Sequence, residues 1–117
     1  MWMKKINFSL PFPVSVNALY NGGSGQKRFP SKKYKAWLVA CPRLPNLQLS
    51  NISIHYRFFF PDNRMRDMEN NVKCVSDYLV KCGVIVDDCW QIVNEMHLTH
   101  GGIDKKNPRV EIDIMES

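Results

Sequence analysis

A strand followed by a helix occupies the middle of the chain and gives the clearest pattern in the sequence. From Asn51 to Phe60, apolar residues alternate with polar ones and then become continuous and aromatic, which is typical of a buried strand. Pro61-Asp62-Asn63 ends this strand. From Asp67 to Cys82, apolar residues recur at helical spacing, and Gly83 stands where a C-terminal cap belongs. The pattern predicts a sheet with a helix packed on it.

Weaker patterns on either side complete the order of elements. Lys4–Leu10 and Arg109–Met115 alternate and are predicted as strands, and a further strand is expected from Trp90 to about His100. Ser31 can cap a short helix that ends before Pro42. The order is β-α-β-α-β-β, so the fold class is α+β. We expect a single small domain with helices packed on a mixed sheet, and an antiparallel hairpin from the last two strands.

Composition narrows the class of protein. The chain has 117 residues, of which 44% are hydrophobic and 23% charged, as in an ordinary globular domain. Its N-terminus lacks the apolar core of a signal peptide, so a cytoplasmic location is expected. The four cysteines form no CxxC pair, which favours buried thiols over a zinc or redox motif. His97 and His100 lie three apart on a predicted strand, face opposite sides, and are not expected to share a metal ion.

Charge is divided unevenly along the chain. Residues 1–61 carry nine bases and no acid, whereas residues 62–117 carry all eleven acids and seven bases. An acid-free basic half favours a polyanionic partner, most simply nucleic acid. The alternative is a solvated basic surface without a partner.

A glycine-rich loop over residues 21–28 ends in two cations, Lys27 and Arg28. It is not a Walker A loop, because no Gly-Lys-Ser/Thr sequence closes it. An ordinary surface loop and a loop that contacts phosphate both fit this composition.

Acidic residues gather in one stretch that could carry chemistry. Asp67, Glu69 and Asp88 lie within 22 residues, together with Asp77 and Asp87. A helix of about 15 residues and a short return can bring Asp88 back beside Asp67. Converging carboxylates suit Mg²⁺, a hard cation that takes oxygen ligands and can activate water beside a phosphate. Lys73 follows Glu69 by four residues, so the two are expected to share a helix face.

A purely structural explanation of these acids is also open. Asp67 and Glu69 could simply stabilise a helix N-terminus, where acids are common, and Asp87-Asp88 could be a turn. Adjacent residues of an extended chain point in opposite directions, so at most one of Asp87 and Asp88 should face a site.

The acidic stretch and the residues on either side of it resemble the RusA family of Holliday-junction resolvases. The resemblance rests on Pro61-Asp62-Asn63-Arg64-Met65-Arg66-Asp67-Met68-Glu69-Asn70-Asn71-Val72-Lys73, Asp77-Tyr78-Leu79 and Gly83-Val84-Ile85-Val86-Asp87-Asp88. The segment from Leu10 to Tyr20 is similar to the opening of that family. The resemblance implies that residues 1–117 form one RusA-like endonuclease domain, which acts in DNA recombination and repair. Members of the family are found largely in phages and prophages. The resemblance also implies a homodimer that depends on Mg²⁺ (or Mn²⁺), binds four-way DNA junctions and nicks two strands symmetrically.

The resemblance assigns roles to particular residues. It implies catalytic roles for Asp67, Glu69, Lys73 and Asp88, with the three acids as metal ligands. The basic residues expected to bind DNA are Lys27, Arg28, Lys32, Lys33, Arg64 and Arg66. The family usually has Asp where this chain has Glu69, which reaches one methylene further. The competing hypotheses are therefore a non-catalytic junction-binding or DNA-binding module with a degenerate metal site, and an interaction protein with an idle basic surface.

Overall fold

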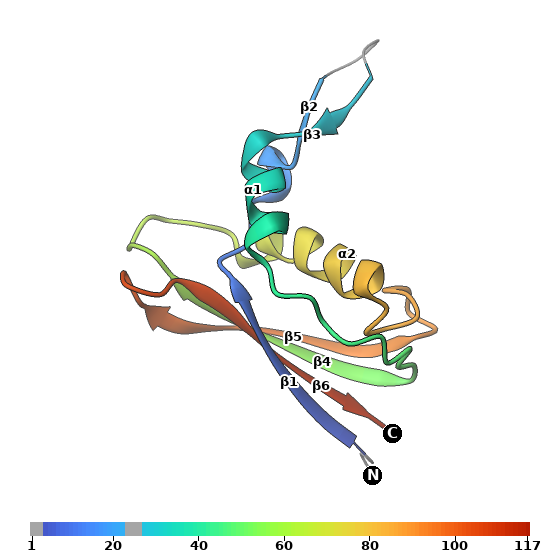
Figure 1. Ribbon diagram of the computed structural model, residues 1–117. Coiled ribbons are helices and arrows are strands. Elements are labelled where there is room, and N and C mark those ends of the chain that lie inside the picture. Colours follow the sequence, from blue (N-terminus) through green and yellow to red (C-terminus); the bar gives the residue numbers. More distant parts are fainter. Residues whose placement is uncertain (1–3, 23–26) are drawn as a thin grey trace.

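A four-stranded mixed sheet supports one helix across its face (Figure 1). The computed structural model describes residues 4–22 and 27–117. The strands are β1 (Lys4–Pro11), β4 (Ile52–Phe60), β5 (Val93–Ile103) and β6 (Arg109–Glu116), in the spatial order β1-β6-β4-β5. β6 runs antiparallel to both of its neighbours, and β5 runs parallel to β4. The α+β class and the order of the main elements are confirmed.

The last two strands do not form the expected hairpin. β4 lies between β5 and β6, and the register pairs Tyr56 with Leu98 on one side and with Ile112 on the other. β4 is the apolar, aromatic strand, and such a strand is best placed in the interior of a sheet. The segment from β4 through the helix to β5 is then a parallel crossover unit, and the chain must cross β4 to enter β6.

The predicted helix over residues 67–82 is broken in two. A single 3₁₀ turn, η2 (Met68–Asn71), precedes α2 (Lys73–Cys82). Asn70 and Asn71 are poor helix formers, which accounts for the break. Gly83 ends α2 in the left-handed conformation with φ 80°, as its position predicted.

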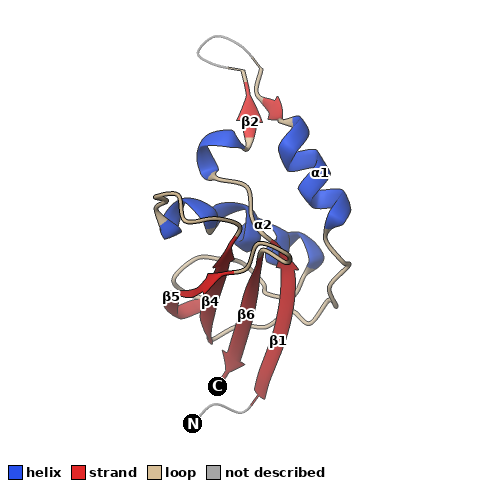
Figure 2. Cartoon of the chain, turned by 90° about the vertical axis from the view of Figure 1, so that its left-hand side faces the viewer, coloured by secondary structure: helices blue, strands red, loops and turns tan. Residues whose placement is uncertain are grey.

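The segment from η1 to α1 stands away from the sheet (Figures 1 and 2). It contains η1 (Val16–Ala18), a two-stranded ribbon of β2 (Tyr20–Asn21) and β3 (Phe29–Pro30), and α1 (Lys32–Ala40). Ser31 caps α1 as expected, because its Oγ accepts a hydrogen bond from the Tyr34 amide at 3.1 Å. The Ser31 amide donates to the Leu19 carbonyl at 2.9 Å and closes the base of the ribbon.

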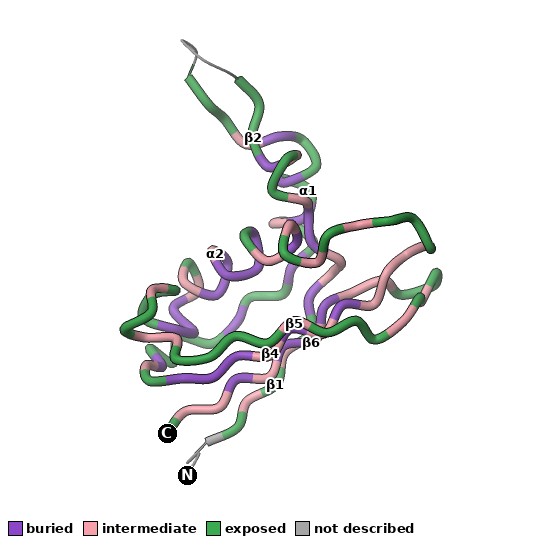
Figure 3. The backbone as a smooth tube through the Cα atoms, turned by 180° about the vertical axis from the view of Figure 1, so that it is seen from behind, coloured by how far each residue is buried: buried purple, intermediate pink, exposed green. Residues whose placement is uncertain are grey.

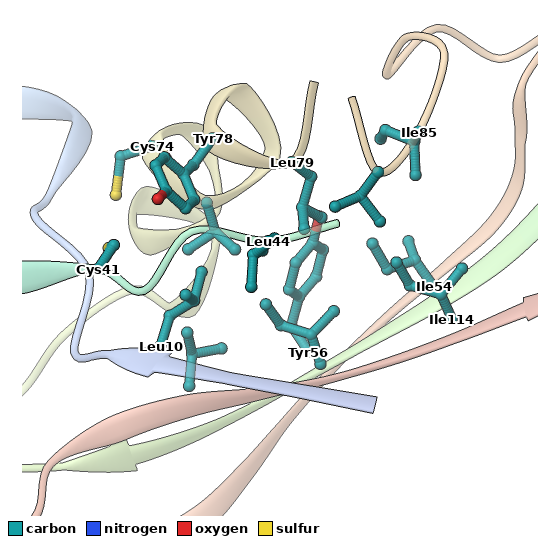
Figure 4. Close-up of a cluster of buried hydrophobic side chains, with 14 of the residues drawn as sticks. Leu10, Cys41, Leu44, Ile54, Tyr56, Cys74, Tyr78, Leu79, Ile85 and Ile114 are labelled. Carbon is teal, nitrogen blue, oxygen red and sulfur yellow. The ribbon is translucent and has the colours of Figure 1, made fainter. Parts of the chain in front are cut away.

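The core lies between the inner face of the sheet and α2 (Figures 3 and 4). Leu10, Ile54 and Ile114 from three strands meet Leu79 of α2, and all four side chains are fully buried. Tyr56 enters the same layer, where its hydroxyl shares a hydrogen bond of 2.8 Å with the Ser76 hydroxyl. Burial of these side chains fixes α2, and therefore the turn before it, against the sheet.

Histidines and cysteines serve the fold in the described residues. The His97 ring packs against the His55 ring, and the His100 ring packs against the Phe60 ring. The four cysteines are free thiols, buried or half-buried. Within residues 4–22 and 27–117, no helix is long and apolar enough to cross a membrane.

Candidate active site

The turn between β4 and α2 presents the first two predicted acids to solvent. Asp67 is the N-cap residue of η2, yet its side chain makes no capping hydrogen bond. Glu69 lies in the first turn of η2, and both side chains are exposed. Because a capping carboxylate would accept a backbone N–H, Asp67 does not fill the capping role that the structural explanation gives it.

The candidate ligands differ from most acids of the chain in having no partner. Seven of the eleven carboxylates take part in hydrogen bonds or ion pairs, for example Asp62 with Arg66 and Asp104 with Arg109. Among the described residues, the carboxylates without such a partner are those of Asp67, Glu69, Asp88 and Glu95. Three of these four are the predicted metal ligands, and their oxygens are free to take a cation.

Lys73 pairs with Asp77 rather than with Glu69. Its Nζ donates to Asp77 Oδ1 at 3.0 Å, one helical turn further along α2. The break at Val72 removes Glu69 from α2, so the expected shared helix face of Glu69 and Lys73 is not formed. Asp77 was not among the residues predicted for the site, although its spacing from Lys73 is that of a helical ion pair.

Asp88 lies in the field of Lys73. The hydrogen bond and charge of Asp77 raise the pKa of Lys73 above its ordinary value, and the charge of Asp88 adds a smaller rise. Burial raises the pKa of Tyr56, and Asp88 contributes to that rise as well. The charge of Asp88 therefore acts on both Lys73 and Tyr56, more weakly than the main cause in each case.

The two neighbouring aspartates have different surroundings. The Asp87 carboxylate accepts the backbone N–H of Asp88 at 2.8 Å and so holds the turn. Asp88 is exposed and its carboxylate is one of those without a partner in the described ranges. The two neighbouring carboxylates therefore differ in their partners, and the expectation that at most one of them faces a site stays a prediction.

A cleft of about 730 Å³ opens beside Asp67. Its rim carries Lys33, Arg64 and Arg66, three of the residues predicted to bind DNA, and its walls include Phe12 and Trp37. The structure therefore brings one predicted ligand and three predicted cations together. Glu69, Lys73 and Asp88 do not line this cleft.

Arg66 is held in place at the cleft by a carboxylate and two rings. Its Nη1 donates to Asp62 Oδ1 at 2.7 Å, and its guanidinium lies 5.8 Å from the Phe12 ring and 5.9 Å from the Phe60 ring. The hydrogen bonds from Arg66 and from the Arg64 amide hold the pKa of Asp62 well below its usual range. Arg66 thus keeps a fixed direction at low conformational cost.

The other predicted DNA-binding residues lie on the projecting part of the chain. Lys27 and Arg28 are exposed beside β3, and the Arg28 guanidinium lies 5.2 Å from the Tyr20 ring centre. Lys32 is exposed in the first turn of α1, next to Lys33. The exposed rings of Tyr20 and Phe29 were missed by the sequence analysis, although aromatic residues flank the loop on both sides.

The donor set suits a hard divalent cation, because carboxylate oxygens are the ligands that Mg²⁺ prefers. Within the described ranges, however, no three His, Cys, Asp or Glu side chains are arranged to hold a metal ion. The assignment of Asp67, Glu69 and Asp88 as joint ligands stays a prediction.

The fold is a small α+β domain in which the Asp67 carboxylate, unpaired within the described residues, lines a cleft together with three cations. Such a domain is suited to contact a phosphate backbone. The family model described as Endodeoxyribonuclease RusA matches residues 11–115, so the chain belongs to the RusA family. Curated relatives include the crossover junction endodeoxyribonuclease RusA of Shigella sonnei (strain Ss046) and that of Escherichia coli (strain K12). Each is 28% identical to this chain over 123 residues, which cover 97% of both sequences.

Proposed function

We propose that this chain is a structure-selective endodeoxyribonuclease that resolves four-way DNA junctions by paired symmetric nicks. The observation that carries the proposal is the match to the RusA family over residues 11–115 in a chain whose predicted catalytic acids are without partners in the described structure. The curated relatives, whose match covers 97% of this chain, are named crossover junction endodeoxyribonucleases. We therefore infer that a DNA junction is the substrate.

Asp67, Glu69 and Asp88 would hold Mg²⁺, with Mn²⁺ as a substitute. When bound, the ion supplies an activated water and stabilises the charge that develops on the phosphate oxygens. Glu69 reaches one methylene further than the Asp usual in the family, so its carboxylate can still take part in ligation. The ligands come from the turn before α2 and from the loop after it, so the α2 crossover unit determines their separation.

Lys73 acts as a cation or proton donor rather than as a base. Its pKa is raised above the ordinary value, mainly by Asp77, so the amine stays protonated at neutral pH. A protonated amine near Asp88 can stabilise negative charge on the phosphate or donate a proton to the leaving oxygen. Asp77 serves as a positioning residue that holds the Lys73 amine at 3.0 Å.

Substrate binding relies on the cations of the cleft and of the projecting ribbon. Lys33, Arg64 and Arg66 lie at the cleft beside Asp67, where they can hold the backbone around the reacting phosphate. Lys27, Arg28 and Lys32 extend the basic surface away from the sheet. A homodimer would present two such sites related by a twofold axis, which suits two symmetric cuts in a junction.

Cleavage of a synthetic four-way junction tests the proposal. We expect nicked linear duplexes in the presence of Mg²⁺, an intact junction with EDTA, and a sedimentation mass of two chains. A folded protein that leaves the junction intact with both Mg²⁺ and Mn²⁺ would contradict the proposal.

The competing hypothesis of a degenerate, non-catalytic module has a specific test. Glu69 stands where the family usually has Asp, and a misplaced ligand would abolish cutting while junction binding persists. In that case the Glu69→Asp variant should cut the junction and the wild type should not. Under our proposal, the wild type cuts and the variant differs only in rate.

A further inference from the structure

The lining of the cleft beside Asp67 is polar and apolar in about equal parts. Phe12, Pro13, Val14 and Trp37 line it, whereas the cations lie on the segment that leads to Asp67 and on α1. Phosphate is bound by cations and backbone donors and gains nothing from aromatic or aliphatic walls. Flat apolar walls suit the face of a planar ring.

An unsatisfied amide lines the same cleft. Asn71 is only 3% exposed, and within the described residues its Nδ2 is buried without a hydrogen-bond partner. A buried amide donor without an acceptor destabilises the folded chain. Polar groups in protein interiors are nearly always paired. Because Asn71 lines the cleft, a ligand there can supply the missing acceptor when the amide turns toward the cleft.

An asparagine side chain carries a donor and an acceptor on one plane. This pair matches the edge of a nucleobase, which presents donors and acceptors side by side. The cations at the cleft attract the phosphate that is attached to the base, and Asp67 lies in the same cleft.

We propose that the cleft receives one unstacked nucleobase of the DNA substrate, next to the phosphate that is cut, and that Asn71 reads its hydrogen-bonding edge. This inference rests on the proposed function, and it makes Asn71 a determinant of sequence preference. Bases at junction branch points are less well stacked than in duplex DNA, so moving one into a pocket costs less there. The cleft thereby contributes to the preference for branched over linear DNA.

A structural role for Asn71 predicts different behaviour. A structural amide would have a partner within the fold, and its replacement by an apolar residue would lower stability. The orphaned Nδ2 predicts the reverse, because Asn71→Leu removes an unpaired donor and keeps a similar side-chain shape. We therefore expect Asn71→Leu to keep its stability and to lose sequence preference.

The experiment compares the wild type with Asn71→Leu and, as a matched control, Asn63→Leu. Asn63 is exposed on the same connection and does not line the cleft. Junctions that differ only in the base pairs flanking the branch point are cut with Mg²⁺, and rates are ranked. We expect Asn71→Leu to lose roughly tenfold in discrimination between the best and the other sequences, whereas Asn63→Leu keeps the wild-type ranking. The thermal midpoint of Asn71→Leu should equal or exceed that of the wild type.

Two results would overturn the inference while leaving the proposed function intact. One is a wild type that cuts all junction sequences at the same rate. The other is an Asn71→Leu protein with the wild-type ranking. If the leucine lowers the thermal midpoint, Asn71→Ala, which cannot clash with the walls, decides by the same ranking. A wild type that neither binds nor cuts junctions contradicts the proposed function itself.

Discussion

The carboxylates of the described residues are of two kinds. Some form ion pairs or hydrogen bonds within the fold, and others face solvent without a partner. Asp62 and Asp77 pair with Arg66 and Lys73. Asp67 and Asp88 have no such partner within the described structure, although Asp67 occupies an N-cap position. Asp67 and Asp88 are among the carboxylates proposed to hold a metal ion.

Replacing Asp67 or Asp88 by Asn should separate binding from cutting. Each variant keeps the shape of the side chain and loses an anionic ligand, so we expect junction affinity to persist and the cutting rate to fall at least about a hundredfold. Glu95→Gln is the control, because Glu95 is also unpaired in the described residues but lies on β5. Gel-shift and cleavage assays measure both quantities. Normal cutting by either Asn variant would remove that residue from the site.

The protonation of Lys73 provides a second test among single residues. Asp77, and to a smaller extent Asp88, raise the pKa of the amine, so deprotonation should begin only above the ordinary lysine range. Asp77→Asn removes the main cause, and the midpoint of Lys73 should then shift to lower pH. The ¹³Cε chemical shift of Lys73 in a pH titration reports this midpoint. An unchanged midpoint in Asp77→Asn would show that the ion pair does not form in solution.

At the scale of single elements, the sequence predicted the strands and the caps better than the connections. Alternation placed β1, β4 and β6 within a residue or two, since one face of each strand packs on the core. It did not predict the break before α2, because the apolar spacing continues through η2. The predicted hairpin of the last two strands was wrong, because β4 lies between β5 and β6. Strand order depends on packing over the whole sheet, which a local pattern does not contain.

Ser31 joins two elements and should be sensitive to substitution. Its Oγ accepts from the Tyr34 amide and donates to the Ala18 carbonyl at 2.6 Å, which links α1 to η1. Ser31→Ala leaves both groups without that partner, so we expect the free energy of unfolding to fall by about 1–2 kcal/mol. Ser9→Ala, an exposed position on β1, should change it by less than about 0.5 kcal/mol. Urea denaturation measures both, and equal stabilities of the two variants would contradict the assigned cap.

At the scale of the whole molecule, one part of the acid-free half of the sequence, the ribbon and α1, becomes a projecting basic surface. The ribbon and α1 stand away from the sheet, and they carry Lys27, Arg28, Lys32 and Lys33 (Figure 2). The charge asymmetry was readable from the sequence. Its direction in space was not, because the hydrogen bond from Ser31 to Leu19 that positions the ribbon leaves no periodic signal.

Salt dependence of junction binding tests the role of this surface. Binding releases counterions in proportion to the phosphates neutralised, so affinity should fall steeply with salt. A variant with Lys27→Ala and Arg28→Ala should reduce the slope of log affinity against log salt by about 2. Lys105→Ala with Lys106→Ala removes the same charge from the β5–β6 connection and should leave the slope nearly unchanged. Equal slopes for the two double variants would argue against the ribbon as a DNA contact.

The central claim is that carboxylates from the two ends of the α2 segment share one divalent ion. Mn²⁺ binding, followed by electron paramagnetic resonance on wild type, Asp67→Asn, Asp88→Asn and the Glu95→Gln control, tests it most directly. We expect both Asn variants to bind Mn²⁺ at least about tenfold more weakly, as loss of a first-sphere or supporting ligand does, with the control unchanged. Wild-type Mn²⁺ affinity and an unchanged spectrum in Asp88→Asn would contradict the claim.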